Sequence, residues 1–251
     1  TIGFQDRAVK AEQVSAREYM TMVNEALVNS GGSNKYSEDD ILATERGDDP
    51  YNHSYLNWGD EVYKPTYITQ HTLNLTGGSE VGRYLVSFDY LDQPGLVKNT
   101  EYQRYSYRVN TDLNIGKMLK VSSDVTYRHI DRLWPEALGS VQYDVWSMQP
   151  TSPVRYENGD YRLDKQNRNA ISLMDMDVVG EDRYNKDVVY GQVKADFEPI
   201  KDLVFTGMAS LNGSWDRRKI HYKNHKYYNE VGELITQRNN PNSVKDSRND
   251  S

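Results

Sequence analysis

An alternation of apolar and polar side chains with a period of two recurs in six segments, and it limits the chain to long β-strands with two unlike faces. In 83–90, for example, apolar or aromatic residues occupy every second position at Tyr84, Val86, Phe88 and Tyr90, with Arg83, Ser87 and Asp89 between them. The six segments are Tyr67 to Thr76, Val81 to Leu91, Tyr102 to Ile115, Leu119 to His129, Val188 to Glu198 and Leu203 to Trp215. Strands of about 9–11 residues cross a bilayer, whereas strands of soluble sheets usually have about 5–6 residues. The predicted strands are therefore long enough to cross a membrane.

The connections between these strands alternate strictly between short and long. The short ones are 77–80, 116–118 and 199–202, and the longer ones are 8–66, 92–101 and 130–187. Alternate connections of an antiparallel meander lie at opposite ends of the sheet, so tight turns are expected at one end and large loops at the other. This asymmetry is typical of outer-membrane barrels, and it predicts apolar strand faces that contact lipid.

The same pattern assigns polar side chains to a barrel lumen and aromatic side chains to the membrane boundary. The lumen set is Arg83, Asp89, Arg104, Arg108, Asp112, Lys120, Asp124, Arg128, Lys194 and Asp196. The predicted aromatic girdle is Tyr67, Tyr90, Tyr105, Tyr127 and Trp215, which lie toward strand ends on the apolar face. Tyrosine is unusually frequent, with 20 Tyr against 4 Phe and 4 Trp, and its amphipathic ring suits such boundaries as well as sugar- or protein-binding surfaces.

The first part of the chain reads as helix and loop. Ser15 and Glu18 form a capping box that predicts a helix ending at Gly31 and Gly32, and a second helix is expected from Ser37 to Gly47. The segment 1–7 is a candidate seventh strand. Six or seven strands are fewer than the eight or so of the smallest closed single-chain barrels, so the sequence predicts part of a larger barrel.

We therefore expect an all-β fold, an antiparallel meander forming part of a large transmembrane outer-membrane β-barrel, with a helical extracellular loop near the N-terminus. The chain is interpreted as one partial barrel domain, 1–251. Its expected divisions are 8–66 as the helical first extracellular loop, 67–129 as strands, 130–187 as a long extracellular loop, 188–215 as strands and 216–251 as the start of a further loop.

Composition excludes several function classes. The chain has no cysteine, which excludes disulfides, thiolate metal sites and cysteine nucleophiles. Its net charge is -7 and it has no basic run, which argues against nucleic acid as a partner. No apolar stretch approaches the roughly 20 residues of a spanning helix. No catalytic motif, cofactor motif or complete metal-ligand pattern is present, so neither an enzyme nor a cofactor or metal site is predicted.

Several spaced sequence blocks resemble one family. GGSE at 77–80, LDQ at 91–93, NT at 99–100 and YQRYS at 102–106 follow the order found in the early barrel of SusC/RagA-like TonB-dependent outer-membrane transporters. Upstream, REYMTMVNEAL, YSEDDILA and LNWGDEVYK resemble the helical first extracellular loop of that family, and SPVRYENGDYRL resembles one of its hairpins. Pro94 departs from the family pattern at a loop tip. The resemblance covers nearly the whole chain.

The resemblance implies import of oligosaccharides or peptides across the outer membrane of a Gram-negative bacterium. It also implies a SusD-like surface lipoprotein that closes the extracellular mouth, and energy supplied through TonB, which contacts an N-terminal part that this sequence does not include. The plug domain of the family is likewise expected to be absent. Outer-membrane lipid is the surrounding medium on this interpretation.

Candidate solute-binding residues come from the long loop, where rings could stack on sugars or grip peptides. They are Trp134, Tyr143, Trp146, Tyr156 and Tyr161, each of which could instead pack the loop against its neighbours. Asn158 and Gly159 predict a type I′ hairpin turn. His221 and His225 are four residues apart, but no acidic motif completes a zinc site, so two surface histidines are expected.

Two other classes of protein remain open on the sequence. A soluble, tyrosine-rich β-sandwich that binds carbohydrate would bury Val86, Phe88, Val109 and Val193 in a core between its sheets. A secreted glycoside hydrolase would need two carboxylates about 5–10 Å apart in a cleft, and no pair is singled out by the sequence.

Overall fold

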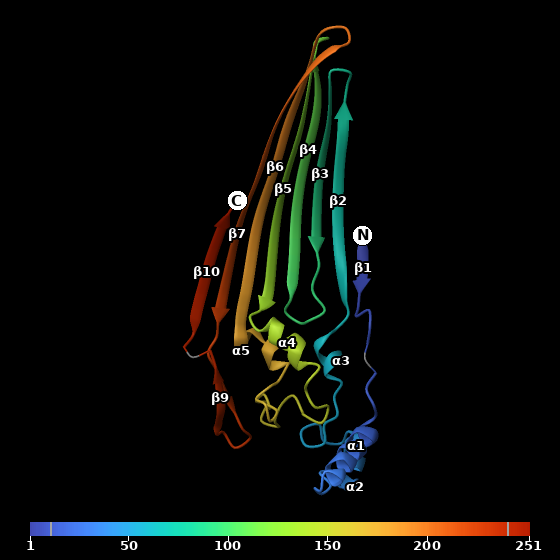
Figure 1. Cartoon of the computed structure of the whole chain (residues 1–251), viewed down its shortest axis with the longest axis vertical. Coiled ribbons are helices and arrows are strands. Elements are labelled where there is room, and N and C mark those ends of the chain that lie inside the picture. The colour runs from blue at the N-terminus through green and yellow to red at the C-terminus, as the bar shows by residue number, and fades with distance from the viewer. Residues whose placement is uncertain (11, 240) are drawn as a thin grey trace.

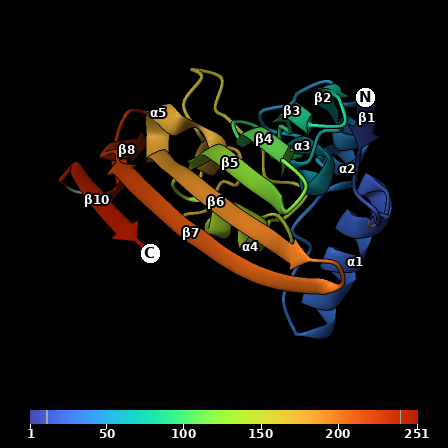
Figure 2. The same ribbon diagram turned by 90° about the horizontal axis from the view of Figure 1, so that it is seen from above.

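The computed structural model describes residues 1–10, 12–239 and 241–251. Its main element is one antiparallel sheet of eight strands in the order β1-β2-β3-β4-β5-β6-β7-β10. The strands are β1 Ile2–Gln5, β2 Thr66–Gly78, β3 Gly82–Asp92, β4 Glu101–Ile115, β5 Leu119–Pro135, β6 Gly180–Ile200, β7 Leu203–Tyr222 and β10 Ser243–Asp250. Figure 1 shows them as one tall, twisted sheet, and Figure 2 shows the same succession of strands from above. The predicted meander is confirmed, and 2–5 does form a strand.

The sheet remains open between its two edge strands. In the described part of the chain, β1 pairs only with β2 and β10 pairs only with β7. The segment expected to be loop from 216 onward is different in the structure, because β7 continues to Tyr222 and β10 returns along it for eight residues. The polar sequence of β10 concealed this strand, since neither of its faces repeats apolar side chains.

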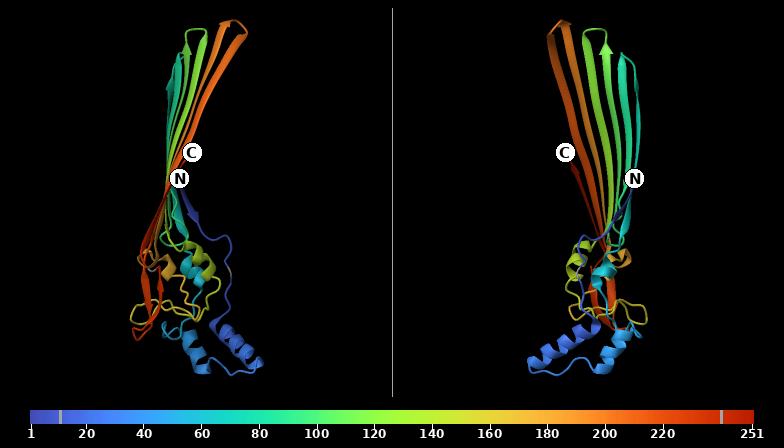
Figure 3. Two further views of the ribbon diagram at one scale, coloured as in Figure 1. Left: turned by 60° about the vertical axis from the view of Figure 1, so that its left-hand side comes forward. Right: turned by 90° about the vertical axis from the view of Figure 1, so that its right-hand side faces the viewer.

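The long connections all lie at one end of the sheet and the short ones at the other, as Figures 1 and 3 show. We call the helices and loops at the first end the loop layer, which comprises 6–10, 12–65, 93–100, 136–179, 223–239 and 241–242. Strands β5 and β6 run further into this end than expected, so the long loop is 136–179 rather than 130–187. Gly180, at the start of β6, has φ +95°, and a Cβ there would collide with the backbone oxygen of His221.

The loop layer contains α1 Ala16–Asn29, α2 Glu38–Arg46, α3 Trp58–Val62, α4 Leu138–Asp144, η1 Ser172–Met174, α5 Met176–Val179, β8 His225–Tyr228 and β9 Leu234–Arg238. The capping box of Ser15 and Glu18 is present, and Ser37 and Asp40 form a second one. Helix α1 ends two residues before Gly31, while α2 ends as predicted at Gly47 in the left-handed conformation.

The hairpin at Asn158 and Gly159 is present, but its turn is not type I′. Type I′ needs positive φ at both residues, and only Gly159 has it, with φ +91°. The backbone N–H of Gly159 donates to the oxygen of Tyr156 at 3.0 Å, and Arg155 pairs with Tyr161. A three-residue loop with glycine in the left-handed position accounts for this geometry.

The only buried apolar cluster found among the described residues lies in the loop layer, not on the sheet. It includes Trp58, Val62, Val141 and Val179, each at most 3 % exposed. By contrast, the apolar faces of the strands are open, and Leu211 is 67 % exposed. A β-sandwich would cover this face with a second sheet, but the other described sheet is the β8–β9 hairpin of the loop layer. No helix in the described residues is long and apolar enough to cross a membrane.

Candidate solute-binding vestibule

The strand register places the predicted lumen residues on one face of the sheet. Across β3 to β6, for example, Arg83 lies opposite Asp112, which lies opposite Ser122, and Ser122 lies opposite Lys194. Polar side chains on this inward face bond across strands. Asp89 accepts from Gln70 at 2.6 Å, Thr72 at 2.8 Å and Arg104 at 3.1 Å; Asp124 accepts from Arg108 at 2.6 Å; Asp196 accepts from Thr206 at 2.7 Å and Lys194 at 2.9 Å. The inward face is therefore a hydrogen-bonded, charged surface.

The opposite, outward face carries a row of rings across four strands. The ring centroids are 6.4 Å apart for His71 and Tyr90, 4.8 Å for Tyr90 and Tyr105, and 6.3 Å for Tyr105 and His129. Nearer the turns, a second row joins Phe88, Tyr107 and Tyr127. Trp215 continues the first row on β7, because it lies opposite Asp187, the partner of His129. Of the predicted girdle, Tyr90, Tyr105, Tyr127 and Trp215 thus share one band of the sheet.

Beyond this aromatic band the outward face changes character. On the side of the turns its residues are apolar, such as Val109 and Leu211, whereas on the side of the loops they are charged. Arg183 lies 3.8 Å from Asp131, and Arg217 contacts Asp246 at 2.5 Å. An outward face that is apolar below an aromatic band and charged above it is typical of a strand that leaves a bilayer.

A groove at the mouth of the sheet lies between the inward face and the loop layer. It has a volume of 580 Å³, and its lining includes Tyr63, Leu96, Tyr102, Arg104, Trp134 and Leu138. Arg104 and Trp134 belong to the strands, while Tyr63 and Leu138 belong to the loop layer. The loop layer therefore folds over the polar side of the sheet. We call this feature the mouth groove.

The structure brings together only two of the five predicted solute-binding rings. Trp134 lines the mouth groove, and the Arg132 guanidinium lies 3.7 Å from the centre of its ring. Trp146 is 60 % exposed and stacks on Tyr63, another residue of the groove, at 6.4 Å. Tyr63 and Tyr102 were not predicted as site residues, although Tyr63 stands in the LNWGDEVYK block of the family resemblance.

The other three rings lie elsewhere in the loop layer. Tyr143 is exposed on α4, and Tyr156 lies near the 158–159 hairpin with Arg162 over its ring at 5.4 Å. Tyr161 is 8 % exposed, belongs to the buried cluster and donates its hydroxyl hydrogen to Asp175 at 2.8 Å. Burial and this bond raise the pKa of Tyr161 to about 12. Its observed role is packing.

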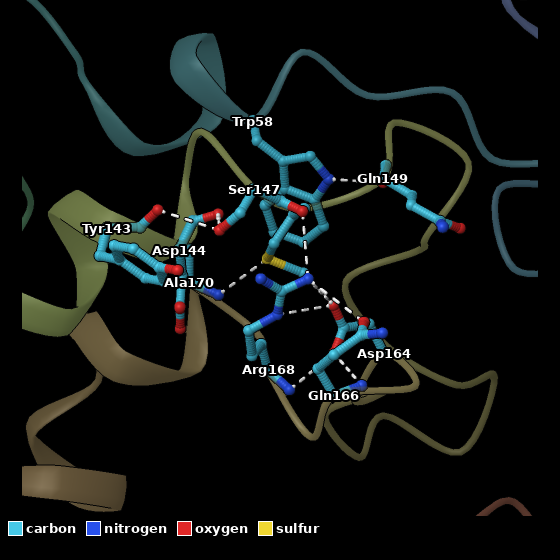
Figure 4. Close-up of polar contacts among 10 residues, drawn as sticks. Trp58, Tyr143, Asp144, Ser147, Gln149, Asp164, Gln166, Arg168 and Ala170 are labelled. Carbon is cyan, nitrogen blue, oxygen red and sulfur yellow. Dashed lines mark hydrogen bonds and ion pairs between the residues drawn. The ribbon is translucent and has the colours of Figure 1, made fainter.

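The long loop is fixed internally by polar contacts shown in Figure 4. Arg168 binds the Asp164 carboxylate through Nε at 2.9 Å and Nη2 at 2.7 Å, and Nη2 also donates to the backbone oxygen of Ser147 at 3.1 Å. The Trp58 indole N–H donates to the backbone oxygen of Gln149 at 3.0 Å. These bonds tie α3 to the long loop and fix the fold of the loop around 147–168.

A second cavity, of 460 Å³, lies between α4, the 163–173 segment and the β8–β9 hairpin. Asp144 lines it and is only 7 % exposed. Burial raises the pKa of the Asp144 carboxyl; the positive charges of Arg168 and Arg238 oppose that rise, and the negative charge of Asp164 adds to it. We call this feature the Asp144 cavity.

These sites offer aromatic rings, guanidinium groups and carboxylates as binding groups. The described residues contain no group of three or more His, Cys, Asp or Glu side chains that could hold a metal ion. Of the acidic residues just before β6, Asp175 accepts from Tyr161 and Asp177 pairs with Lys223 at 2.8 Å. Rings, guanidinium groups and carboxylates at the mouth can recognise sugars or peptides without forming covalent bonds.

No family model matches the chain. Its sequence is nevertheless similar to part of several TonB-dependent receptors. TonB-dependent receptor P26 of Formosa agariphila is 32 % identical over 114 residues, which are 45 % of this chain and 11 % of the receptor. TonB-dependent receptor SusC of Bacteroides thetaiotaomicron is 26 % identical over 105 residues, 41 % of this chain and 10 % of SusC. The chain thus matches about a tenth of the length of these curated relatives.

Solved structures of RagAB agree with the sequence relatives. The RagAB peptide transporter matches with a TM-score of 0.69 and 18 % identity, over 91 % of this chain and 29 % of the transporter chain. The RagAB peptide importer in its open-open state matches with a TM-score of 0.66, again at 18 % identity and over 91 % of this chain and 28 % of the other. At this identity the likeness shows the fold alone.

Proposed function

From its similarity to part of the SusC/RagA-like TonB-dependent transporters, which the relatives and the fold support, we propose that the chain contributes a section of barrel wall and outer vestibule to an outer-membrane nutrient importer. The parent protein would lie in the outer membrane of a Gram-negative bacterium and take up oligosaccharides or peptides. A SusD-like lipoprotein would cover the loop layer, and TonB would drive transport. Recognition and gated passage make up the mechanism, with no covalent step.

One observation carries this proposal: the outward face of the sheet changes from apolar to charged at a band of aromatic rings, while the inward face is mainly polar over that span. A soluble protein has no reason to keep Val109 and Leu211 exposed on one side and a network of carboxylates and guanidiniums on the other. In a membrane each face meets the medium it matches. An open edge cannot stand in lipid, so the proposal also requires further strands that pair with β1 and β10.

The domain division follows from the same proposal. The whole of 1–251 would be one partial barrel unit, in which 8–66 and most of 130–187 form extracellular loops. The loop at 223–242, with its β8–β9 hairpin, would belong to the same outer surface. Trp134 and Trp146, joined through Tyr63, are the rings that we propose contact the solute at the mouth.

Single cysteines test the assignment of the two faces, and these 251 residues contain no cysteine of their own. Val109→Cys and Val193→Cys report on the outward face, and Arg108→Cys and Lys194→Cys are their neighbours on the inward face. In the membrane-assembled parent protein, a fluorophore on the first pair should be quenched by brominated lipid. The second pair should react with a water-soluble thiol reagent. If the first pair is shielded from lipid in a protein that stays in solution, the membrane proposal fails.

The solute class is tested by uptake. Cells with and without the parent protein are given a labelled oligosaccharide or a labelled peptide mixture, and accumulation is compared. Uptake of one class should depend on the protein and on an energised inner membrane. Equal accumulation of both solutes in both cell lines would contradict import by this protein.

A further inference from the structure

Asp144 is a buried carboxylate without a counter-charge of its own. The residue is 7 % exposed, its carboxylate opens into the Asp144 cavity, and none of the described residues gives that carboxylate a hydrogen bond or an ion pair. Figure 4 accordingly shows bonded contact at Asp144 only through its backbone oxygen, which accepts from Ser147. Burying an ionised carboxylate without a partner is costly, so such groups are usually paired.

The two arginines near the Asp144 cavity are already paired with other acids. Arg168 holds the Asp164 carboxylate through two nitrogens, and Arg238 donates to Glu136 at 3.0 Å. Their charges reach Asp144 only through space. The Asp144 carboxylate is therefore free to bind a cationic group that enters the cavity.

The helix that carries Asp144 adds to this demand for a cation. Asp144 is the last residue of α4, and no basic residue stands in the last turn of that helix. The backbone oxygens at this helix end are bonded, since that of Asp144 accepts from the backbone N–H groups of Ser147 and Met148 at 2.9 and 3.0 Å. The carboxylate therefore lies at the negative end of a helix, where a positive charge is favoured and a second negative charge is not.

The rim of the cavity supplies an aromatic ring. Tyr143, adjacent to Asp144, lines the same cavity and is 72 % exposed. A tyrosine ring attracts cations over its face, so the ring and the carboxylate have compatible preferences. The floor is polar: the Ser172 and Tyr227 hydroxyls bond each other at 3.2 Å and Asn169 donates to two backbone oxygens, while the Nε of Arg238 is buried without a hydrogen-bond partner.

We propose that the Asp144 cavity is a binding site for a primary ammonium group on the imported solute. This inference deepens the proposed import function, because it names the chemical group by which the vestibule would select a solute. The ammonium group would donate to the Asp144 carboxylate and lie against the Tyr143 ring. Both a peptide N-terminus and an amino sugar carry such a group, whereas a neutral oligosaccharide does not.

The parent protein, purified in detergent, allows a direct test by titration calorimetry. The probes are triglycine and glucosamine, each compared with its N-acetylated form, which lacks the positive charge. Hydrogen bonds to a charged group contribute about 1.5–3 kcal/mol, so at least one free amine should bind ten-fold or more tightly than its acetylated form. Preference for triglycine identifies a peptide terminus as the source, and preference for glucosamine identifies an amino sugar.

Asp144→Asn removes the charge and keeps the shape, and Glu157→Gln, at the exposed tip of the neighbouring hairpin, is the matched control. Asp144→Asn should weaken amine binding ten-fold or more, while Glu157→Gln leaves it unchanged. Thermal unfolding of both variants shows whether the fold persists. Equal binding of free and acetylated probes, no binding of either amine, or full binding by a folded Asp144→Asn variant would overturn the proposal.

The outcome is separable from that of the membrane proposal. If the outward cysteines contact lipid but no amine binds, the importer stands and the ammonium site fails. If amines bind through Asp144 but the outward face is shielded from lipid, the site stands and the importer fails.

Discussion

The sheet and the loop layer of this protein are stabilised in opposite ways. The loop layer has a conventional core, in which Trp58, Val62 and Val141 are almost completely buried. The sheet has no such core, and its strands are held by cross-strand backbone pairing and by polar bonds on one face. The loop layer can thus satisfy its apolar groups by itself, whereas the sheet needs an apolar medium to cover its outward face.

Low exposure therefore identifies structurally important apolar residues only where other protein groups cover them. It does not identify them on the outward face, which a surrounding apolar medium would cover. Exposed Leu211 and exposed Trp146 have similar accessibility, 67 % and 60 %. The first belongs to the apolar outward face, and the second stacks on Tyr63, which lines the mouth groove. The effect of a substitution on the outward face should therefore depend on the surrounding lipid, whereas the effect of one in the loop layer should depend on packing within the protein.

The largest effect is expected from Trp58→Ala in the loop core. Trp58 is 3 % exposed and bonds the backbone of Gln149, so the variant leaves both a void and an unpaired carbonyl. Large aromatic-to-alanine changes in cores cost about 3–5 kcal/mol. Hydrogen exchange should show faster opening of the loop layer with unchanged protection in β4 to β6. Loss of protection in the strands as well would mean that the two regions unfold as one unit.

A charge on the outward face should give the next effect. Leu211→Arg places a guanidinium on the apolar face, and in a bilayer this costs about 2–4 kcal/mol near the midplane. Ser210→Arg is the matched control, because the adjacent residue faces the polar side. Reversible urea unfolding from lipid vesicles compares the two. Equal stability of both variants would contradict the difference between the faces.

A smaller effect of opposite sign is expected from Asp144→Asn. Burial raises the folded-state pKa of this carboxyl above its unfolded value, so the folded protein binds the proton more tightly. The native protein should therefore lose stability as pH rises from the unfolded pKa through the raised folded pKa. The variant, which has no such proton, should melt at a higher temperature than the native protein above that range, and the gap should close below it. A variant that melts lower at neutral pH would show that the carboxylate has a stabilising partner.

The smallest effect on stability is expected from Trp146→Ala. Its side chain is largely exposed, and substitutions at such positions usually change stability by about 0.5 kcal/mol or less. Solute uptake should nevertheless fall if Trp146 and Trp134 line the path at the mouth. Tyr156→Ala, away from that groove, serves as the control. Unchanged uptake by Trp146→Ala would remove this ring from the proposed site.

The sequence alone determined the strands, the two faces and the placement of the long loops. A period of two is local and repeats over ten or more residues, so it identifies strands and their faces without knowledge of their partners. Capping boxes are equally local, which is why α1 and α2 were predicted close to their true bounds. β10 was missed because a polar edge strand has no such period.

Only the tertiary structure decided which rings meet and where charge is left unpaired. Trp134 and Trp146 come together through Tyr63, a residue 71 positions before Trp134 in the chain, and Tyr161 turns inward to the loop core. Asp144 is isolated because Arg168 is engaged by Asp164, four residues before it, and Arg238 by Glu136, which is 102 positions away in the chain. Contacts between residues far apart in the chain form only when the long loops close. The spacing of residues along the sequence therefore does not predict which side chains will pair.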